Sequence, residues 1–252
     1  MGKTSQKQKA PDILADIVDA MAGRSVLVIG DIMLDRFVYG DVNRISPESP
    51  VPVLTVKNET LMLGGAGNVL SNLAGLNVTT RLVCIVGNDR EAGEIKDLIA
   101  SRKAVTNGLI TDESRPTTVK TRFLASHQQL LRTDYEKAEP VSSNIEEKIL
   151  KQAEAALESA GAVILSDYGK GTLTDKVITA IIKAARKKKI PVLVDPKGSD
   201  YSKYKGASVV TPNRKEIGEA TGGLPTATDQ DVTLAGQHLI EKTGVEAVLA
   251  TR

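Results

Sequence analysis

The feature that most constrains this chain is a series of short apolar runs that alternate with helical patterns. SVLVIGD at Ser25–Asp31 and RLVCIVG at Arg81–Gly87 are two of these runs. Uninterrupted Val, Ile and Leu runs are typical of strands buried on both faces, and strands of this kind joined by helices form parallel sheets. The predicted fold is therefore α/β, with a doubly wound, mostly parallel sheet and helices on both of its faces.

The rest of the chain continues this alternation. Further strands are predicted at Ala162–Asp167, Pro191–Asp195, Ser208–Thr211 and Val245–Thr251. Helices are predicted at Ala66–Gly75, Glu91–Ser101, Ser143–Ala160, Thr174–Lys189, Asn213–Thr221 and Asp229–Lys242. Ser143 and Glu146 have the spacing of a capping box, which would begin the helix at Ser143.

Two segments, at about 37–57 and 117–132, depart from this rhythm. Their apolar and polar residues alternate, which is typical of strands with one face in water. We expect a small antiparallel β lid that projects from the C-terminal edge of the main sheet and covers a site there, because lids exclude water from chemistry. An edge hairpin with no covering role is the alternative.

Composition excludes several classes of protein. The 252 residues suffice for one large α/β domain, and a net charge of +2 gives no basis for binding nucleic acid or an anionic membrane. No apolar run approaches the roughly 18 residues that span a bilayer, and no signal peptide is recognisable. The single Cys84 lies inside an apolar run and predicts a buried thiol. We expect a cytoplasmic protein whose residues 1–12 form a polar, disordered tail.

Polar residues follow several of the predicted strands. Ligands of open α/β sheets bind beyond the C-terminal ends of the strands, so these residues predict a shared site. They are Asp31, Asp167, Lys170, Asp195, Lys197, Asn213 and Glu216. Known nucleotide motifs do not match: Gly171 follows Lys170 where a P-loop needs Ser or Thr, and Leu70 stands where a dinucleotide fingerprint needs its last glycine.

The stretch GGAGN, at Gly64–Asn68, leads directly into a predicted helix. Helix N-termini present unpaired N–H groups, and glycines allow a ligand to approach the backbone. The Asn68 amide adds donors and an acceptor. This set suits sugar hydroxyls as well as phosphates, so the residues alone predict a small polar ligand that is phosphorylated.

Five short motifs occur in the order in which the ribokinase-like carbohydrate kinases carry them. They are GDIMLD at Gly30–Asp35, GGAGN, SDYGKG at Ser166–Gly171, VDPKG at Val194–Gly198 and TPNRKE at Thr211–Glu216. The resemblance runs from about Ser25 to the last residue. Two lid stretches, Asn43–Val53 and Lys120–Arg132, resemble the family members that phosphorylate D-glycero-β-D-manno-heptose 7-phosphate.

This resemblance implies a kinase that transfers the γ-phosphoryl group of ATP to the C1 hydroxyl of the heptose 7-phosphate, with Mg²⁺ as cofactor. The product would be the 1,7-bisphosphate, a precursor of ADP-heptose and of the lipopolysaccharide inner core. A kinase for another sugar phosphate and a non-catalytic ligand-binding module of the same fold are the alternatives. Apolar outer faces of the lid predict a homodimer; nucleic acid and membranes are not expected as partners.

The family pattern assigns residues to three groups. The positions expected to bind substrate are Asp31, Asn43, Arg44, Gly64, Gly65, Asn68, Asp167 and Lys170, with the lid residues Lys120, Arg122, Gln128 and Arg132. Arg suits this role because its planar fork pairs with phosphate oxygens bidentately. The nucleotide side is assigned to Lys197, Asn213, Arg214, Lys215 and Glu216. Asn213 and Glu216 are expected to hold Mg²⁺ through water.

One part of the family pattern is missing. The D-x-x-G-A-G-D run, which supplies the catalytic base in the family, does not occur in the 252 residues. No catalytic residue is therefore predicted within the given chain, and the base aspartate is expected to follow Arg252. We expect residues 1–252 to form a single ribokinase-like kinase domain whose C-terminal part is missing; a fused nucleotidyltransferase domain is left open.

Overall fold

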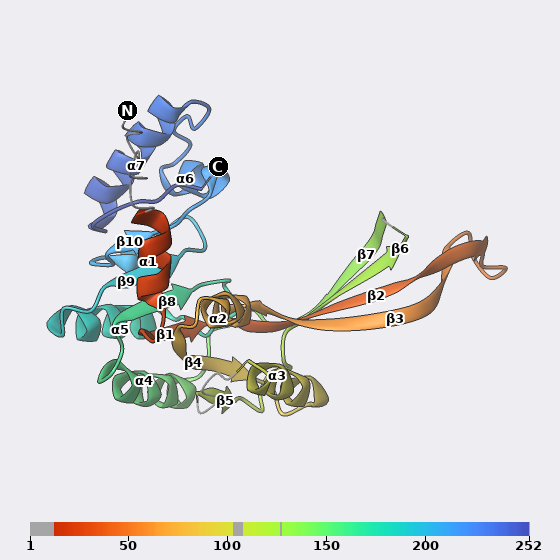
Figure 1. Ribbon diagram of the computed structural model, residues 1–252. Coiled ribbons are helices and arrows are strands. Elements are labelled where there is room, and N and C mark those ends of the chain that lie inside the picture. Colours follow the sequence, from red (N-terminus) through yellow and green to blue (C-terminus); the bar gives the residue numbers. More distant parts are fainter. Residues whose placement is uncertain (1–12, 103–107, 127, 252) are drawn as a thin grey trace, which may run out of the picture.

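The computed structural model describes residues 13–102, 108–126 and 128–251. Its main sheet has six strands in the order β10–β9–β8–β1–β4–β5, and all the pairings between them are parallel (Figure 1). These strands are β1 (Ser25–Gly30), β4 (Thr79–Val86), β5 (Leu109–Thr111), β8 (Ala162–Ser166), β9 (Val192–Asp195) and β10 (Val209–Val210). The parallel sheet predicted from the apolar runs is confirmed.

Successive side chains of a strand point to opposite faces of a sheet. The strands of this sheet are apolar on both faces, and helices cover both. In β1, Leu27 and Ile29 join a core cluster with residues of α4 and α5, whereas Val28 joins a second cluster with residues of α2 and α3. The fold is therefore doubly wound, as predicted. The helices are α1 (Ile13–Met21), α2 (Ala66–Gly75), α3 (Arg90–Ala100), α4 (Ser143–Leu157), α5 (Asp175–Lys187), α6 (Arg214–Ala220) and α7 (Asp229–Thr243). A 3₁₀ turn covers Ser202–Tyr204.

A second sheet, here called the lid sheet, extends away from the main sheet (Figure 1). Its order is β3–β2–β6–β7, with β2 (Ile32–Ile45), β3 (Pro52–Gly65), β6 (Val119–Ala125) and β7 (Gln128–Tyr135). The β2–β3 and β6–β7 pairings are antiparallel, but β2 and β6 are parallel. The expected antiparallel lid is therefore a mixed sheet. The reason is topological: β2 and β6 both run outward, and each is followed by a strand that returns.

Local differences from the sequence-based expectations have physical causes. The predicted capping box at Ser143 is wrong: the N-cap is Ser142, without a side-chain bond, and Glu146 accepts hydrogen bonds from Thr174 Oγ1 and Lys176 Nζ at the start of α5. The predicted strand at Val245–Thr251 is reduced to two isolated parallel bridges, since neighbouring β10 has only two residues.

Two further expectations concern burial and membranes. Cys84 is buried and free, as expected. No helix within the described ranges is long and apolar enough to cross a membrane. The expected disordered tail at residues 1–12 lies outside the described residues.

Candidate functional site

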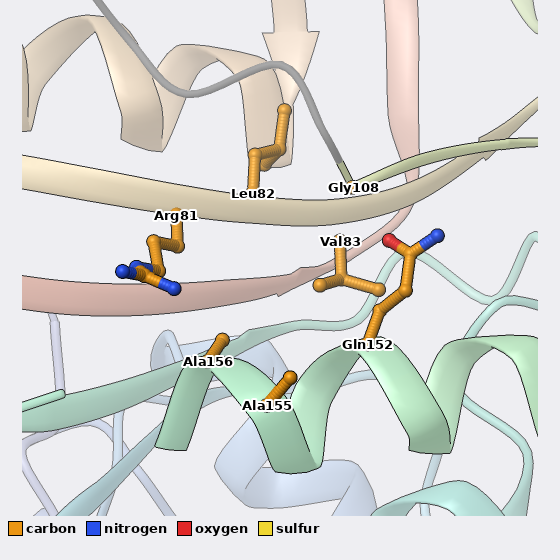
Figure 2. Close-up of a pocket in the computed structure, with 7 residues that line it drawn as sticks. All are labelled: Arg81, Leu82, Val83, Gly108, Gln152, Ala155 and Ala156. Atoms are coloured by element: carbon orange, nitrogen blue, oxygen red, sulfur yellow. The ribbon is translucent and has the colours of Figure 1, made fainter. Parts of the chain in front are cut away.

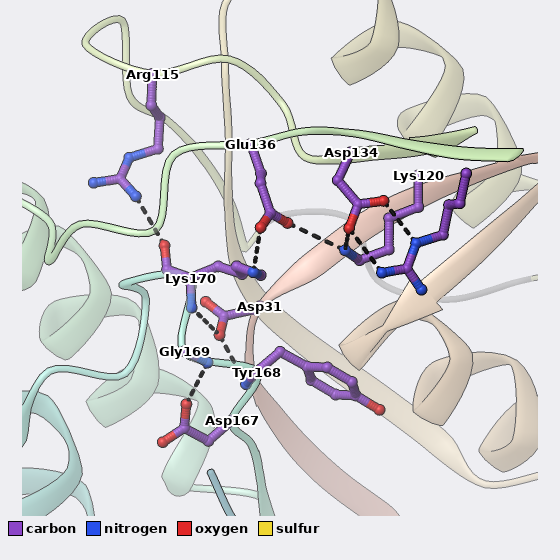
Figure 3. A network of polar contacts seen from close by, with 10 residues as sticks. Asp31, Arg115, Lys120, Asp134, Glu136, Asp167, Tyr168, Gly169 and Lys170 are labelled. Atoms are coloured by element: carbon purple, nitrogen blue, oxygen red, sulfur yellow. Dashed lines mark hydrogen bonds and ion pairs between the residues drawn. The ribbon is translucent and has the colours of Figure 1, made fainter. Parts of the chain in front are cut away.

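The loop between β8 and α5 is held by one buried carboxylate. Asp31, which lies between β1 and β2, is 2% exposed and accepts hydrogen bonds from three backbone N–H groups, of which those of Tyr168 and Lys170 can be followed in Figure 3. The donors are Tyr168 at 2.9 Å, Lys170 at 3.0 Å and Thr172 at 3.1 Å. A charged acceptor satisfies donors that would otherwise be costly to bury. Asp31 was expected to face the sugar, but in the structure its carboxylate anchors this loop.

A cavity of about 420 Å³ lies between the lid sheet and the start of α2, and is here called the lid cavity. Its lining combines apolar, glycine, polar and charged residues from β2, β3, α2, β6, β7 and the anchored loop. They are Met33, Asp35, Phe37, Met62, Leu63, Gly64, Gly65, Asn68, Lys120, Arg122, Arg132 and Tyr168. Six of the predicted substrate residues therefore meet in one place.

The two glycines at the end of β3 are required by the protein's own packing. Gly65 has a φ of +57°, and a Cβ there would clash with the Asp31 carbonyl oxygen. A Cβ on Gly64 would clash with the Asp35 carboxylate and with Met33. Gly64 and Gly65 thus let the end of β3 pass close to β2, and this brings Asn68, in the first turn of α2, to the cavity wall.

Cations gather on the cavity side of the lid sheet. Arg122 of β6 and Arg132 of β7 are directly paired across the antiparallel ladder. Like charges opposite one another destabilise a sheet unless anions compensate them. Arg122 NH1 lies 2.5 Å from Asp35 Oδ1, and its guanidinium stands 5.1 Å from the centre of the Phe37 ring. This cross-strand arginine pair is a feature expected of a site for anions.

Acidic partners connect the remaining cations (Figure 3). Lys120 Nζ donates to Asp134 at 2.8 Å and to Glu136 at 3.2 Å, and Lys170 Nζ donates to Glu136 at 2.5 Å. Hydrogen bonds from Lys120 outweigh the smaller effect of burial and hold the pKa of Asp134 below its usual range. Burial is the largest single effect on Glu136 and would raise its pKa, but the bonds from both lysines together lower it. Both carboxylates are therefore ionised at neutral pH.

A second cavity of about 260 Å³, the strand-edge cavity, opens at the C-terminal ends of the main-sheet strands. It is lined by Asp167, Tyr168, Asp195, Pro196, Lys197, Thr211, Asn213, Glu216 and Thr251. Tyr168 lines both cavities, so the two are neighbours. Burial and then the neighbouring Asp195 carboxylate raise the pKa of the Tyr168 hydroxyl. The hydroxyl is therefore protonated at neutral pH.

The acids of the strand-edge cavity differ in how they are compensated. Asp167 is 3% exposed and accepts hydrogen bonds from the Tyr204 hydroxyl at 2.6 Å and from Lys203 Nζ at 2.9 Å. Burial and the negative charge of Glu216 raise the pKa of Asp195. The strand-edge cavity therefore has two carboxylates, those of Asp195 and Glu216, beside the single ammonium group of Lys197 among its described lining residues.

Asn213 and Glu216 also begin helix α6. The Asn213 side chain accepts from the backbone N–H groups of Lys215 and Glu216, and Glu216 Oε2 accepts from the backbone N–H of Asn213 at 2.9 Å. Glu216 Oε1 lies 3.7 Å from Lys197 Nζ. Capping alone would explain both residue types, so their exposure to the cavity is what keeps them as candidates for ligand binding.

Within the described ranges, no group of three or more His, Cys, Asp or Glu residues could hold a metal ion. Mg²⁺ does not need such a group, because it keeps several waters and takes one or two carboxylates together with phosphate oxygens. Asp195 and Glu216, two carboxylates that line the same cavity, fit that chemistry.

Several predicted residues are not among those that line either cavity in the described part of the chain. Asn43 and Arg44 are exposed near the outer end of β2, Gln128 is exposed at the start of β7, and Arg214 is exposed on α6. Lys170 lies next to the lid cavity through its bond to Glu136, and Lys215 borders a neighbouring surface depression.

Asp35 and Tyr168 are two of the cavity residues that sequence reasoning missed. Asp35 is the second aspartate of GDIMLD, and the alternation of Met33, Asp35 and Phe37 would have placed all three on one face of a strand. That signal was hidden because the lid was taken to begin at about residue 37. Tyr168 stands beside the predicted Asp167, but nothing in a single sequence indicates that it lines two cavities.

A third cavity, of about 240 Å³, lies between β4 and α4 (Figure 2). Leu82, Val83, Gln152, Ala155 and Ala156 are among its lining residues, with Arg81 at its side. Among the described lining residues there is no carboxylate, hydroxyl or thiol to support chemistry. The lid cavity and the strand-edge cavity are therefore the candidate site.

Comparisons with known proteins agree with this geometry. The family model described as pfkB family carbohydrate kinase matches residues 24–252. The bifunctional protein HldE of Paramagnetospirillum magneticum is 47% identical over 239 residues, which are 95% of this chain and 49% of that protein. HldE of Caulobacter vibrioides is 43% identical over 241 residues, 96% of this chain and 49% of that protein. The chain spans about half the length of the curated relatives it matches.

Solved structures show the same fold. Arabidopsis thaliana ribokinase, complexed with ribose and ATP, matches with a TM-score of 0.65 and 20% identity, over 90% of this chain and 72% of that one. The tetrameric inhibited form of phosphofructokinase-2 from Escherichia coli matches with a TM-score of 0.67 and 19% identity, over the same shares. The predicted ribokinase-like fold is confirmed.

Proposed function

This chain belongs to the pfkB family of carbohydrate kinases, and we propose that it acts on D-glycero-β-D-manno-heptose 7-phosphate. In the proposed reaction the γ-phosphoryl group of ATP is transferred to the C1 hydroxyl of the sugar, giving the 1,7-bisphosphate for ADP-heptose and lipopolysaccharide synthesis. One observation carries the choice of substrate: Lys120, Arg122 and Arg132 line the same cavity as Asn68 and Asp35. A neutral sugar would need the polar groups but not three cations.

In this proposal two kinds of side chain bind different parts of the substrate. The Asp35 carboxylate and the Asn68 amide form hydrogen bonds with the sugar hydroxyls, and the cationic side chains from β6 and β7 bind the 7-phosphate. The relatedness to HldE supports this assignment, since the match covers 95% of the chain at 47% identity. Asn43, Arg44 and Gln128 remain proposed sugar contacts, although they are not among the described residues that line the cavity.

We place ATP in the strand-edge cavity, on the other side of Tyr168 from the sugar. Phosphoryl transfer requires positioning and charge neutralisation more than covalent chemistry from the protein. Mg²⁺, when bound, would neutralise phosphate charge, and Asp195, Glu216 and Asn213 would hold it, partly through water. Lys197 adds a cation beside them. The proton acceptor is assigned to none of the described residues.

The test is ADP release by the full-length protein with four acceptors: heptose 7-phosphate, unphosphorylated heptose, fructose 6-phosphate and ribose. We expect the highest kcat/KM with heptose 7-phosphate and a strict need for Mg²⁺. A preference for fructose 6-phosphate or ribose would contradict the substrate assignment. Binding of the sugar phosphate without any turnover would instead support the non-catalytic module, which is the second candidate for a chain that lacks the D-x-x-G-A-G-D run.

We also propose a cytoplasmic homodimer formed through the lid sheet. Val56, Met62 and Leu131 are each at least half exposed on this sheet, and burying such side chains favours association. Light scattering on the purified protein should give the mass of two chains, and Leu131→Glu should shift it towards one. A monomeric wild-type protein at micromolar concentration would contradict the dimer.

A further inference from the structure

The carboxylate of Asp134 collects donors from two of the cations that line the lid cavity. Arg132 Nε lies 2.9 Å from Asp134 Oδ1, and Arg132 NH2 donates to Asp134 Oδ2 at 3.1 Å, so the guanidinium fork is bidentate. Lys120 Nζ donates to the same Oδ2 at 2.8 Å. Asp134 itself is not among the described lining residues, so it occupies these cations from beside the cavity.

Backbone register holds this arrangement in place. Asp134 is directly paired with Lys120 across the β6–β7 ladder, and Arg132 lies two residues earlier on the same face of β7. The side chain of Arg132 is 49% exposed, so its long, flexible stem can reorient towards the cavity while β7 stays where it is. Lys120 also donates to a second carboxylate, Glu136, so its positive charge keeps an acidic partner when it exchanges Asp134 for a ligand.

The donors that converge on Asp134 are the set that a phosphate group requires. A bidentate guanidinium and an ammonium group bind carboxylate and phosphate oxygens with the same geometry. A phosphate monoester has a charge of about −1.5 to −2 near neutral pH and three acceptor oxygens, against one charge and two oxygens for a carboxylate. It therefore competes well for these donors, whereas a sugar hydroxyl, which has no charge, does not.

We propose that Asp134 is a built-in counter-anion, which pairs with Arg132 and Lys120 in the ligand-free protein and yields them to the phosphate group of the substrate. The proposal rests on the proposed function, because it concerns the same phosphate site. Its consequence is a lower affinity for anions: a phosphate group must displace Asp134 to reach these donors, whereas an unphosphorylated sugar need not. Asp134 also compensates Arg132, which stands opposite Arg122, whenever no ligand is bound.

The sign of one substitution separates this role from a positioning role. Asp134→Asn keeps the size of the side chain and one acceptor oxygen but removes the negative charge. If Asp134 is a competing anion, phosphate ligands should bind more tightly to the variant. If Asp134 instead holds Arg132 and Lys120 in their binding positions, the same variant should bind phosphate ligands more weakly.

The experiment is titration calorimetry on the full-length protein with inorganic phosphate, heptose 7-phosphate and unphosphorylated heptose. Asp134→Asn should lower Kd for both phosphate-bearing ligands by about two- to fivefold, the size expected for a partly exposed ion pair, and leave Kd for heptose unchanged. Asp41→Asn is the matched control: it removes a lid carboxylate that pairs with Lys57, away from both cavities. We expect no change in Asp41→Asn.

Arg132→Ala distinguishes failure of this proposal from failure of the proposed function. If Arg132→Ala weakens heptose 7-phosphate binding by at least about threefold while Asp134→Asn weakens it or leaves it unchanged, the counter-anion role is overturned and the phosphate site stands. If Arg132→Ala leaves the affinity for heptose 7-phosphate unchanged, the phosphate site itself is overturned, and the role of Asp134 with it.

Discussion

The lid cavity and the strand-edge cavity share Tyr168 as a lining residue and have opposite electrostatic character. In the lid cavity each arginine faces a carboxylate, with Arg122 on Asp35 and Arg132 on Asp134. In the strand-edge cavity the acids exceed the cations, because three carboxylates, those of Asp167, Asp195 and Glu216, accompany one cation, Lys197, among the described lining residues. One cavity therefore has an excess of cations in its described lining, and the other has an excess of carboxylates.

This difference indicates two ways of binding an anionic substrate. A site lined by Arg and Lys binds phosphate directly, through charge-assisted hydrogen bonds. A site lined by carboxylates binds phosphate only with a metal ion between them, and Mg²⁺ suits such a site because it bridges carboxylate and phosphate oxygens. The two sets of groups come from different kinds of structure. The register of β6 and β7 places the cations together, whereas the acids lie at strand ends and at the cap of α6.

The largest effect should come from removing the carboxylate that supports both cavities. Asp31→Ala leaves three backbone N–H groups of the β8–α5 loop without an acceptor, so the free energy of unfolding should fall by about 3 kcal/mol. Urea denaturation measures this loss, and Asp31→Asn, which keeps one acceptor, should lose less. A loss below about 1 kcal/mol in Asp31→Ala would mean that the anchoring of the loop is weak.

The next variant separates the cavities. Arg122→Ala removes a cation from the lid cavity and leaves Asp35 unpaired beside the incoming phosphate, so KM for heptose 7-phosphate should rise by about tenfold or more. KM for ATP should stay the same, because the nucleotide is placed in the other cavity. Steady-state kinetics with Lys57→Ala as control tests this, since Lys57 is a lid cation outside both cavities. Equal increases in both KM values would argue against two separate sites.

Glu216→Gln tests whether the strand-edge cavity binds the metal ion independently of the sugar. Gln can still accept the hydrogen bond of the capping box, so α6 should stay folded while one negative charge is lost. The Mg²⁺ concentration for half-maximal activity should rise by about tenfold, and KM for heptose 7-phosphate should not change. Glu219→Gln, one turn later on α6, is the matched control. An unchanged Mg²⁺ requirement would remove Glu216 from the metal site.

The smallest effect concerns the pH dependence of stability. Burial and the charge of Glu216 raise the pKa of Asp195 in the folded protein, so the folded state binds this proton more tightly than the unfolded state. The contribution of Asp195 to stability therefore falls as the pH rises from its unfolded pKa through its raised folded pKa. Asp195→Asn should increase the free energy of unfolding at pH 7, by less than about 1 kcal/mol.

The lid acids provide the contrast for that measurement. Bonds from Lys120 lower the pKa of Asp134, so its contribution to stability is present above its unfolded pKa and is lost as the pH falls through its folded pKa. Urea denaturation at about pH 2.5 and pH 7, on either side of the unfolded pKa of an aspartate, should therefore show opposite trends for Asp195→Asn and Asp134→Asn. The same trend in both variants would contradict the opposite electrostatic character of the two cavities.

Much of the fold could be predicted because its signals are local. Apolar runs separated by helical patterns predicted the parallel sheet, and alternation of polar and apolar residues predicted the lid segments. Boundaries were less predictable: β5 has three residues, too few for a periodic signal, and β2 begins at Ile32, close to the end of β1. The parallel pairing of β2 with β6 depends on the directions of strands far apart in the sequence.

By itself, the sequence determined which chemical groups are available: the glycines before α2, the lid cations Lys120, Arg122 and Arg132, and the acids at the strand ends. Only the tertiary structure decided which of these groups meet. It turned the Asp31 carboxylate towards backbone N–H groups, brought Asp35 into the lid cavity, and left Arg44 exposed near the outer end of β2. The physical reason is that a charged side chain acts on whatever lies within a few ångströms, and those neighbours come from strand register and crossover connections.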